Sequence, residues 1–160
     1  MLPACDAVID HFSKFAREDG MLCDVYDKWN LVDWPDNLRD EYDFPLTRPV
    51  GPGCHNVINA FWVGCVCVTE TLKKLAGVSY TPRAETLKNA FNAAFFKKDA
   101  GVYTDTEASS HSSLHANVIP AFYGLVPEGY TESVADLICE KGMRGGVYMA
   151  FFHLKALARL

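Results

Sequence analysis

The strongest constraint on the fold is a stripe of apolar side chains that recurs at helical spacing between residues 54 and 76. Its members lie one, three, four or seven residues apart, which places them on one broad face of an α-helix: Val57, Ile58, Phe61, Val68, Leu72 and Leu75. Polar residues gather late in this stretch, and Gly77 follows as a C-cap residue. The sequence therefore predicts one long helix that buries a broad apolar face.

The same kind of spacing predicts five further helices and hardly any strand. They are expected at residues 4–18, at 82–98, at 113–124 with a kink at Pro120, at 131–140 and at 146–160. A short extended piece is expected at residues 102–105. We therefore predict an all-α fold, in which helical hairpins pack side by side in a single domain over residues 1–160.

The last predicted helix lacks a partner for its apolar face. Its large apolar side chains are Val147, Phe151, Phe152, Leu154 and Leu157. An apolar face of this kind is normally covered by another element. We therefore expect residues 1–160 to be a fragment of a larger helical domain. We also expect that two copies can form a homodimer through this open edge, with twofold symmetry as the default.

The charge and hydropathy of the chain argue against two classes of partner. Lys and Arg number 15 against 20 Asp and Glu, a net charge of −5, and no basic run is present, which disfavours binding to nucleic acid. The longest mainly apolar stretch, residues 60–68, is far shorter than the ~20 residues of a membrane span. Asp6 and Asp10 lie where a signal peptide would carry basic residues. These features predict a cytoplasmic chain that binds neither nucleic acid nor a membrane.

The six cysteines are expected to be thiols. No Cys-x-x-Cys pair occurs, and a domain of this length does not depend on cross-links for its stability. Buried thiols act as small apolar side chains, which is the interpretation favoured here over three disulfides. Cysteine and histidine are not clustered at ligand spacing, and no glycine-rich phosphate loop is present, so neither a metal nor a cofactor is expected.

A functional site is expected in the stretch between residues 21 and 53. This stretch has no helical pattern and holds four of the eight prolines, and a long segment of this kind in a compact domain usually has a function. Within it, Asp33 lies between Trp29 and Trp34. An indole can stack on the apolar face of a sugar while a carboxylate accepts hydrogen bonds from its hydroxyls. The alternative is that both tryptophans cover helix ends and that Asp33 caps a turn.

Further acidic residues follow directly: Asp36, Asp40, Glu41 and Asp43. Clustered carboxylates can act as general acid and general base, because repulsion or burial separates their pKa values. More often such residues form a solvated loop. Asp33 and Glu41 are the candidates for a catalytic role.

Histidine and asparagine residues near two predicted helix starts add candidate binding groups. His55 and Asn59 lie one turn apart at the start of the longest helix, and His115 and Asn117 lie near the start of the helix at 113–124. A neutral histidine can donate a hydrogen bond to a sugar hydroxyl, or it can cap a helix. The candidate substrate-binding residues are therefore Trp29, Asp33, Trp34, His55, His115 and Asn117.

Several segments, in order along the chain, resemble the bacterial α-L-rhamnosidases. Residues 29–34 read W-N-L-V-D-W, which is similar to that family's W-x-F-V-D-W segment. Residues 101–105 (G-V-Y-T-D) resemble its G-x-Y-x-D piece, and residues 113–117 (S-L-H-A-N) resemble its S-x-H-A-N helix start. The stretch leading to residues 54–59 is similar to a loop that enters an inner helix of the family. The resemblance covers most of the chain, from about residue 5 to residue 160.

The resemblance implies a fold and a reaction. The family's catalytic domain is an (α/α)6 toroid of twelve helices, of which six predicted helices are about half. The implied reaction is inverting hydrolysis of a terminal α-L-rhamnoside, with an acid and a base carboxylate ~6.5–9.5 Å apart. The family's general acid precedes the matched region and its general base follows it, so the chain alone is expected to be inactive.

The resemblance also implies a substrate and binding roles. The partner is a rhamnosylated carbohydrate or glycoside, with Asp33 and Trp34 on the pocket floor and His115 and Asn117 near the rim. Two alternatives stay open. The chain can be a non-catalytic helical module that binds carbohydrate or a partner protein, or a toroid that acts on another uronate or hexose glycoside.

Overall fold

The computed structural model describes residues 1–25, 32–43 and 53–160. Regular structure in these residues is mostly helical, so the predicted all-α fold is confirmed. The helices are α1 (Leu2–Ser13), α2 (Asn56–Leu75), α3 (Ala84–Phe95), α4 (Leu114–Tyr123), α5 (Thr131–Lys141) and α6 (Val147–Leu157), with a 3-10 turn η1 (Asp36–Leu38). Strands β1 (Phe96–Lys97) and β2 (Val102–Tyr103) form an antiparallel hairpin. None of the helices in the described ranges has both the length and the apolar character of a membrane span.

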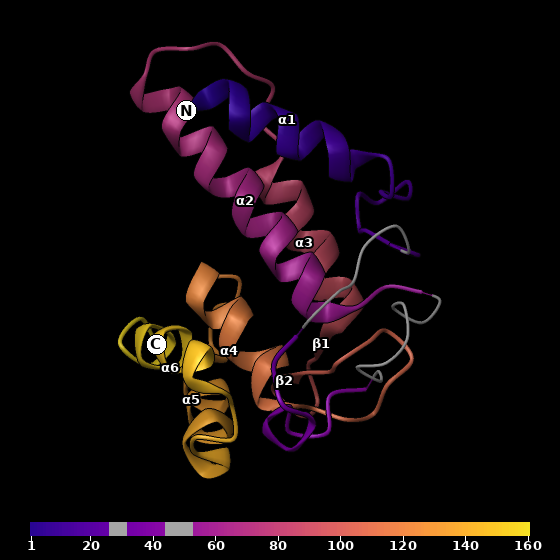
Figure 1. The fold of residues 1–160 in the computed structure, drawn as a ribbon, viewed down its shortest axis with the longest axis vertical. Coiled ribbons are helices and arrows are strands. Elements are labelled where there is room, and N and C mark those ends of the chain that lie inside the picture. Colours follow the sequence, from indigo (N-terminus) through magenta and orange to yellow (C-terminus); the bar gives the residue numbers. More distant parts are fainter. Residues whose placement is uncertain (26–31, 44–52) are drawn as a thin grey trace.

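Helix α2 is the central element of the fold. It contacts α1, α3 and α4, and α4 in turn packs against α5 and α6. Figure 1 shows α1 to α3 as one group and α4 to α6 as a second, with the β-hairpin beside the start of α2. The hydrophobic core is continuous and takes buried side chains from all six of these helices.

Gly64 allows the close contact between the two groups of helices. A Cβ atom at this position of α2 would lie 2.3 Å from the ring of Tyr123 at the end of α4. That separation is far shorter than a van der Waals contact, so only glycine lets the two helices pack this closely. The buried face of α2 differs from the predicted apolar stripe: Val57 is buried as expected, but Val68 and Leu75 are exposed, and Ala60 and Val63 are buried instead.

Two predicted helices end earlier than expected. The first ends at Ser13 rather than at residue 18, because the chain turns there and pairs Ala16 with Leu22 in an antiparallel bridge. Helix α3 ends at Phe95, where Phe96 begins the hairpin that pairs with Tyr103. The predicted helix over residues 97–98 is therefore wrong, whereas the extended piece after residue 101 is confirmed.

Cys23 and Cys54 form a disulfide, which corrects the prediction that all six cysteines are thiols. The two residues pair as an antiparallel bridge, and their Cα atoms lie 4.4 Å apart. A non-hydrogen-bonded antiparallel pair has this separation, so the fold itself aligns the cysteines. Their separation of 31 residues in sequence follows no short spacing rule. The other four cysteines are free, and each is half-buried or exposed.

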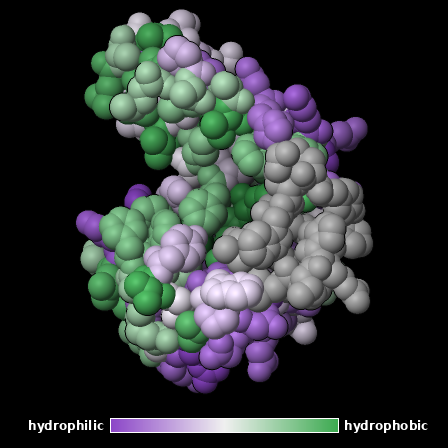
Figure 2. Space-filling view, viewed as in Figure 1, coloured by the Kyte–Doolittle hydropathy of each residue, from purple (hydrophilic) through white to green (hydrophobic). Residues whose placement is uncertain are grey.

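Helix α6 exposes part of its apolar face. Val147, Phe151 and Leu154 are exposed, whereas Phe152 is half-buried against the core. A mainly apolar groove runs beside this face, and Figure 2 shows apolar residues bordering the hollow between the two groups of helices. Its lining comes from α2, α4 and the C-terminal part of the chain, and includes Val68, Leu72, Phe122, Tyr123, Phe151 and Lys155.

Candidate functional site

Residues 32–43, here called the capping segment, hold the starts of three helices together. Asp33 accepts a hydrogen bond from the amide of Gly146 at the start of α6 (2.6 Å), and Asp40 accepts one from Leu114 in α4 (2.7 Å). The hydroxyl of Tyr42 accepts a third from Val57 in α2 (3.1 Å). The first amides of a helix have no partner within the helix, and a carboxylate is favoured there by the helix dipole. One short segment therefore supplies hydrogen-bond acceptors to the first amides of helices that are far apart in sequence.

Asp33 is the centre of this arrangement and is only 3% exposed. Its Oδ1 accepts a hydrogen bond from the amide of Trp34 (2.8 Å), and its Oδ2 lies 2.8 Å from Nε2 of His115 as well as beside Gly146. Burial alone would raise the pKa of Asp33. Hydrogen bonds from His115, Gly146 and Trp34 outweigh burial, so the pKa lies below its usual value. Asp33 is therefore a buried carboxylate whose oxygens are already engaged.

The contacts of His115 indicate which ring nitrogen carries the proton. The side chain is fully buried in the first turn of α4. Its Nδ1 has no hydrogen-bond partner in the described part of the chain, whereas Nε2 faces the Asp33 carboxylate. A proton on Nε2 gives Asp33 a donor and leaves Nδ1 as an acceptor rather than as a buried donor. The hydrogen-bond pattern thus favours an imidazole that donates to Asp33.

Asp40 is the second buried acid of the capping segment. Lys141 at the end of α5 lies 2.8 Å from its Oδ2, and Arg144 lies 3.4 Å from its Oδ1. Burial raises the pKa of Asp40, but the hydrogen bond from Lys141 and the other donors outweigh it and lower the pKa overall. The neighbouring Glu41 is exposed. Asp40 thus ties the start of α4 to the end of α5.

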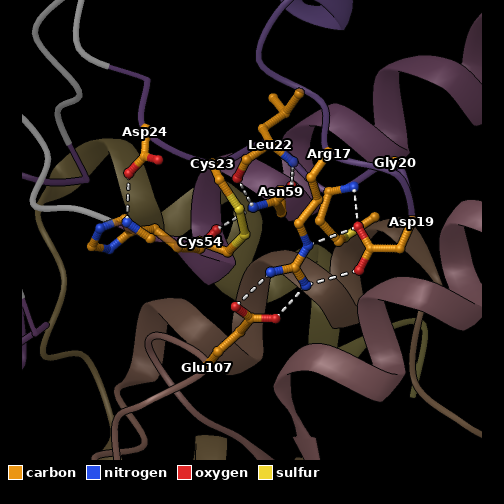
Figure 3. Close-up of a disulfide and its surroundings, with 12 residues drawn as sticks. Arg17, Asp19, Gly20, Leu22, Cys23, Asp24, Cys54, Asn59 and Glu107 are labelled. Carbon is orange, nitrogen blue, oxygen red and sulfur yellow. Dashed lines mark hydrogen bonds and ion pairs between the residues drawn. A yellow bond between two sulfur atoms is a disulfide. The ribbon is translucent and has the colours of Figure 1, made fainter.

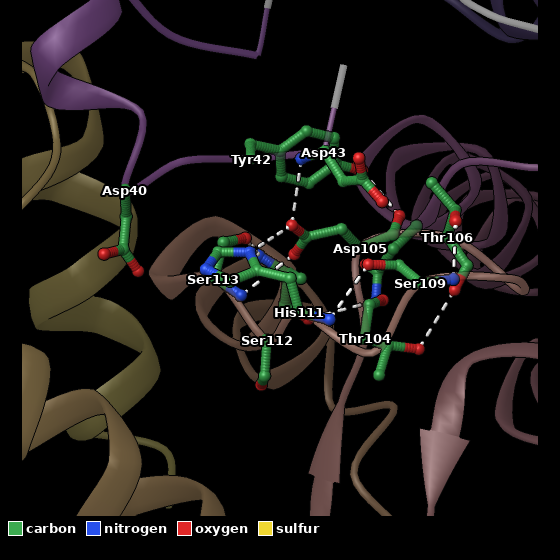
Figure 4. A network of polar contacts seen from close by, with 12 residues as sticks. Asp40, Tyr42, Asp43, Thr104, Asp105, Thr106, Ser109, His111, Ser112 and Ser113 are labelled. Atoms are coloured by element: carbon green, nitrogen blue, oxygen red, sulfur yellow. Dashed lines mark hydrogen bonds and ion pairs between the residues drawn. The ribbon is translucent and has the colours of Figure 1, made fainter.

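A second polar network surrounds Asp105, which follows β2 and is fully buried (Figure 4). Its Oδ1 accepts a hydrogen bond from the amide of Ser113 (2.9 Å), and its Oδ2 accepts one from the amide of Asp43 (3.0 Å). Nδ1 of His111 lies 2.6 Å from the same Oδ2. In Figure 4 Asp40 stands to one side of this network. The two ends of the capping segment are therefore anchored in two separate places.

The structure brings together three of the residues that the sequence indicated. Asp33 and His115 are in direct contact, and Trp34 follows Asp33 with its side chain 62% exposed. A large exposed indole is thus attached to a buried anchor. Trp29 lies outside the described residues.

His55 and Asn117 are part of the internal scaffold. Oδ1 of Asn117 accepts a hydrogen bond from the amide of Tyr103 (2.9 Å), and its Nδ2 donates to the carbonyl of Ser113 (2.9 Å), so it joins α4 to β2. His55 is buried directly before α2 and pairs with Thr106 in an antiparallel bridge. Asn117, like His115, is fully buried rather than near a rim as expected, because its amide groups bind backbone.

Sequence reasoning missed the roles of Asp105 and Gly146. A Cβ atom at Gly146 would lie 2.5 Å from Oδ1 of Asp33 and 3.0 Å from the carbonyl oxygen of Trp34. The Gly145-Gly146 pair is the signal in the sequence that could have indicated this close approach. No group of three or more His, Cys, Asp or Glu in the described ranges is arranged to hold a metal ion. Within residues 32–43, Trp34 is the large aromatic residue that is exposed.

The chain matches a known protein family. The family model described as the bacterial alpha-L-rhamnosidase 6 hairpin glycosidase domain matches residues 2–148. This range contains the whole capping segment, His115 and Gly146. No curated protein matches the chain.

Proposed function

The chain belongs to the bacterial α-L-rhamnosidase six-hairpin glycosidase domain family, and on this premise we propose that it is part of an enzyme that hydrolyses terminal α-L-rhamnosides with inversion. The proposed substrate is a rhamnosylated carbohydrate or glycoside. The family toroid has twelve helices, so we further propose that these residues form about half of the ring.

The observation that carries the proposal is the exposed ring of Trp34. Its backbone is fixed by the hydrogen bond from its amide to Asp33, and Asp33 is itself held by α4 and α6. An exposed aromatic ring on a backbone that is held in place suits stacking on the apolar face of a pyranose, because little backbone freedom is lost on binding. The proposed role of Trp34 is thus a platform for rhamnose, with Asp33 as the residue that positions it.

A non-catalytic binding role is the second candidate, and the engaged carboxylates favour it. Asp33 and Asp40 are the buried acids of the capping segment. Their carboxylate oxygens accept hydrogen bonds from the first amides of helices, and Asp40 also pairs with Lys141. A general acid or base must reach the substrate with a proton or a lone pair available. In this second proposal the chain binds the sugar, and a catalytic pair lies elsewhere.

Binding of L-rhamnose to variants of Trp34 tests the platform. We expect Trp34→Ala to weaken binding about fivefold and Trp34→Phe to weaken it less, since stacking contributes about 1 kcal/mol. Trp62→Phe is the matched control, because Trp62 is buried and its Nε1 donates to the carbonyl of Gly20. Equal affinity of the Trp34→Ala and wild-type chains, measured by calorimetry on folded protein, would remove Trp34 from the site.

Hydrolysis of an aryl α-L-rhamnoside tests whether the chain alone carries a catalytic site. The chain alone is expected to bind rhamnose without turnover. Turnover that disappears in Asp33→Asn or Glu41→Gln would show instead that the capping segment carries a complete catalytic site. Turnover in those variants equal to that of the wild type would assign the chemistry to other residues.

A further inference from the structure

The Cys23–Cys54 disulfide lies at the two ends of the stretch that contains the capping segment. Cys23 precedes this stretch, and Cys54 immediately precedes His55 and helix α2. Figure 3 shows the bond beside the backbone of Leu22 and the side chain of Asn59. The covalent link therefore closes the part of the chain that positions Trp34.

We propose that this disulfide is a redox latch on the sugar site: reduction by a low-molecular-weight thiol loosens the capping segment and weakens sugar binding, while the helices stay folded. The inference rests on the proposed function for its sugar readout only. A cross-link between distant residues limits the open conformations of the chain between them. Without it, local opening that releases the capping segment becomes more populated.

Contacts around the disulfide explain why reduction leaves the surrounding fold in place. Asn59 in α2 accepts a hydrogen bond from the amide of Leu22 (2.7 Å) and donates to its carbonyl (2.9 Å). The amide of Gly53 donates to Oδ1 of Asp24 (2.8 Å), and the amide of Asp24 donates to the carbonyl of Gly53 (3.2 Å). Non-covalent bonds thus keep the two backbone segments paired in the folded state, but unlike the disulfide they can open transiently and release the stretch between them.

The ion pairs of Arg17 hold the neighbouring chain in the same way. Arg17 binds Asp19 and also Glu107, in the loop after β2. These contacts join the chain after α1 to the second half of the molecule without sulfur chemistry. The loss of the disulfide is therefore expected to act on the capping segment and not on the packing of the helices.

The two cysteines differ in access, which sets the direction of thiol attack. Cys23 is half-buried, whereas Cys54 is 2% exposed. The external thiolate attacks Sγ of Cys23, the Cys23–Cys54 bond breaks, and Cys54 leaves as a thiolate that takes up a proton. A second external thiol then attacks the mixed disulfide, which releases Cys23 as a thiol and forms one disulfide between the two external thiols. Two electrons thus pass from the external thiols to the protein.

Amide hydrogen exchange and rhamnose affinity, measured on the oxidised and the dithiothreitol-reduced chain, test the latch. We expect the amides of Val57, Leu114 and Gly146, which the capping segment holds, to exchange about tenfold faster after reduction. The affinity for L-rhamnose is expected to fall according to the fraction of molecules whose capping segment is released. The amide of Ile138, inside α5, is expected to keep its rate.

A variant pair controls for side effects of the reductant. Cys23→Ser combined with Cys54→Ala should reproduce the reduced state under oxidising conditions, with alanine chosen because Cys54 is buried. Cys139→Ser, which changes an exposed free thiol, should leave both readouts unchanged.

The outcomes separate the latch from the proposed function. Unchanged exchange at the three capped amides after complete reduction would overturn the latch, as would equal acceleration at Ile138, which would show general unfolding. Failure of the oxidised chain to bind rhamnose would overturn the proposed function, whatever the exchange rates are. Selective acceleration together with weaker binding supports both.

Discussion

At the scale of single residues, Gly146 controls how closely α6 approaches the capping segment. Its amide donates to Asp33, and a Cβ atom would meet both that carboxylate and the backbone of Trp34. We expect Gly146→Ala to lower the free energy of unfolding by about 1–3 kcal/mol, because an added methyl group must push the two elements apart. Urea denaturation measures the change. The adjacent Val147→Ala, at a 95% exposed position, should cost less than about 0.5 kcal/mol.

The lowered pKa values of Asp33 and Asp40 predict a loss of stability in acid. The unfolded chain binds protons at these residues at higher pH than the folded chain does. Their contribution is therefore fully present above the unfolded pKa of about 3.9 and is lost as the pH falls through the lower folded pKa. The urea midpoint should fall steeply below about pH 4, and Asp40→Asn should make that fall shallower. An equally steep fall in the variant would contradict a role for Asp40.

His153 adds a separate and earlier effect of pH. Burial lowers its pKa, so the folded state resists its protonation. The resulting loss of stability begins as the pH falls below about 6.5, the value of the unfolded chain. In His153→Gln, the urea midpoint should no longer fall as the pH drops below about 6.5, while the steeper fall below about pH 4 should remain.

The sequence predicted Asp33, Trp34 and His115 as site residues, and the structure places Asp33 in contact with the other two, but residue types could not choose among the acids that follow. Asp40 is buried and forms an ion pair with Lys141, while Glu41 beside it is exposed. The choice depends on the local backbone, because both residues have positive φ values, 47° and 55°, that turn their side chains in different directions. No pattern in the sequence specifies that geometry. The partner of Asp40 is also about one hundred residues away in sequence, which spacing rules do not reach.

At the scale of helices and strands, a residue of α2 sets the start of α3. Oε1 of Glu70 accepts hydrogen bonds from the amides of Arg83 (2.7 Å) and Ala84 (3.0 Å). We expect Glu70→Ala to cost about 1 kcal/mol, the usual value for the loss of a capping side chain. Thermal denaturation followed by circular dichroism measures it. Glu140→Ala, at an exposed position of α5, is the matched control, and an equal effect of the two changes would contradict the capping role.

Helix positions were predictable because apolar periodicity is a local signal, as α2 shows. The ends of helices were less predictable, because they depend on contacts with other elements. Helix α3 starts where Glu70 of α2 caps it and ends where the hairpin begins. The disulfide was missed for the same physical reason. Cys23 meets Cys54 only after the chain has turned back beside the start of α2, and no spacing within one element reports that contact.

At the scale of the whole molecule, the exposed face of α6 predicts self-association. Val147, Phe151 and Leu154 are all more than half exposed beside an apolar groove. We propose that two copies associate through this face, since contiguous apolar surface favours burial. Sedimentation velocity should show a fraction of dimer that increases with protein concentration, and Leu154→Glu should abolish the dimer. A monomer at all concentrations would contradict the proposal.

The central claim is that the capping segment presents Trp34 to a rhamnose ring, and a titration followed at the indole N–H groups tests it most directly. Nuclear magnetic resonance resolves each indole separately, and the variants Trp34→Phe and Trp62→Phe assign them. We predict that L-rhamnose shifts the Trp34 signal and leaves that of Trp62, buried against Gly20, in place. A folded, oxidised chain in which saturating L-rhamnose moves no indole signal would contradict the account.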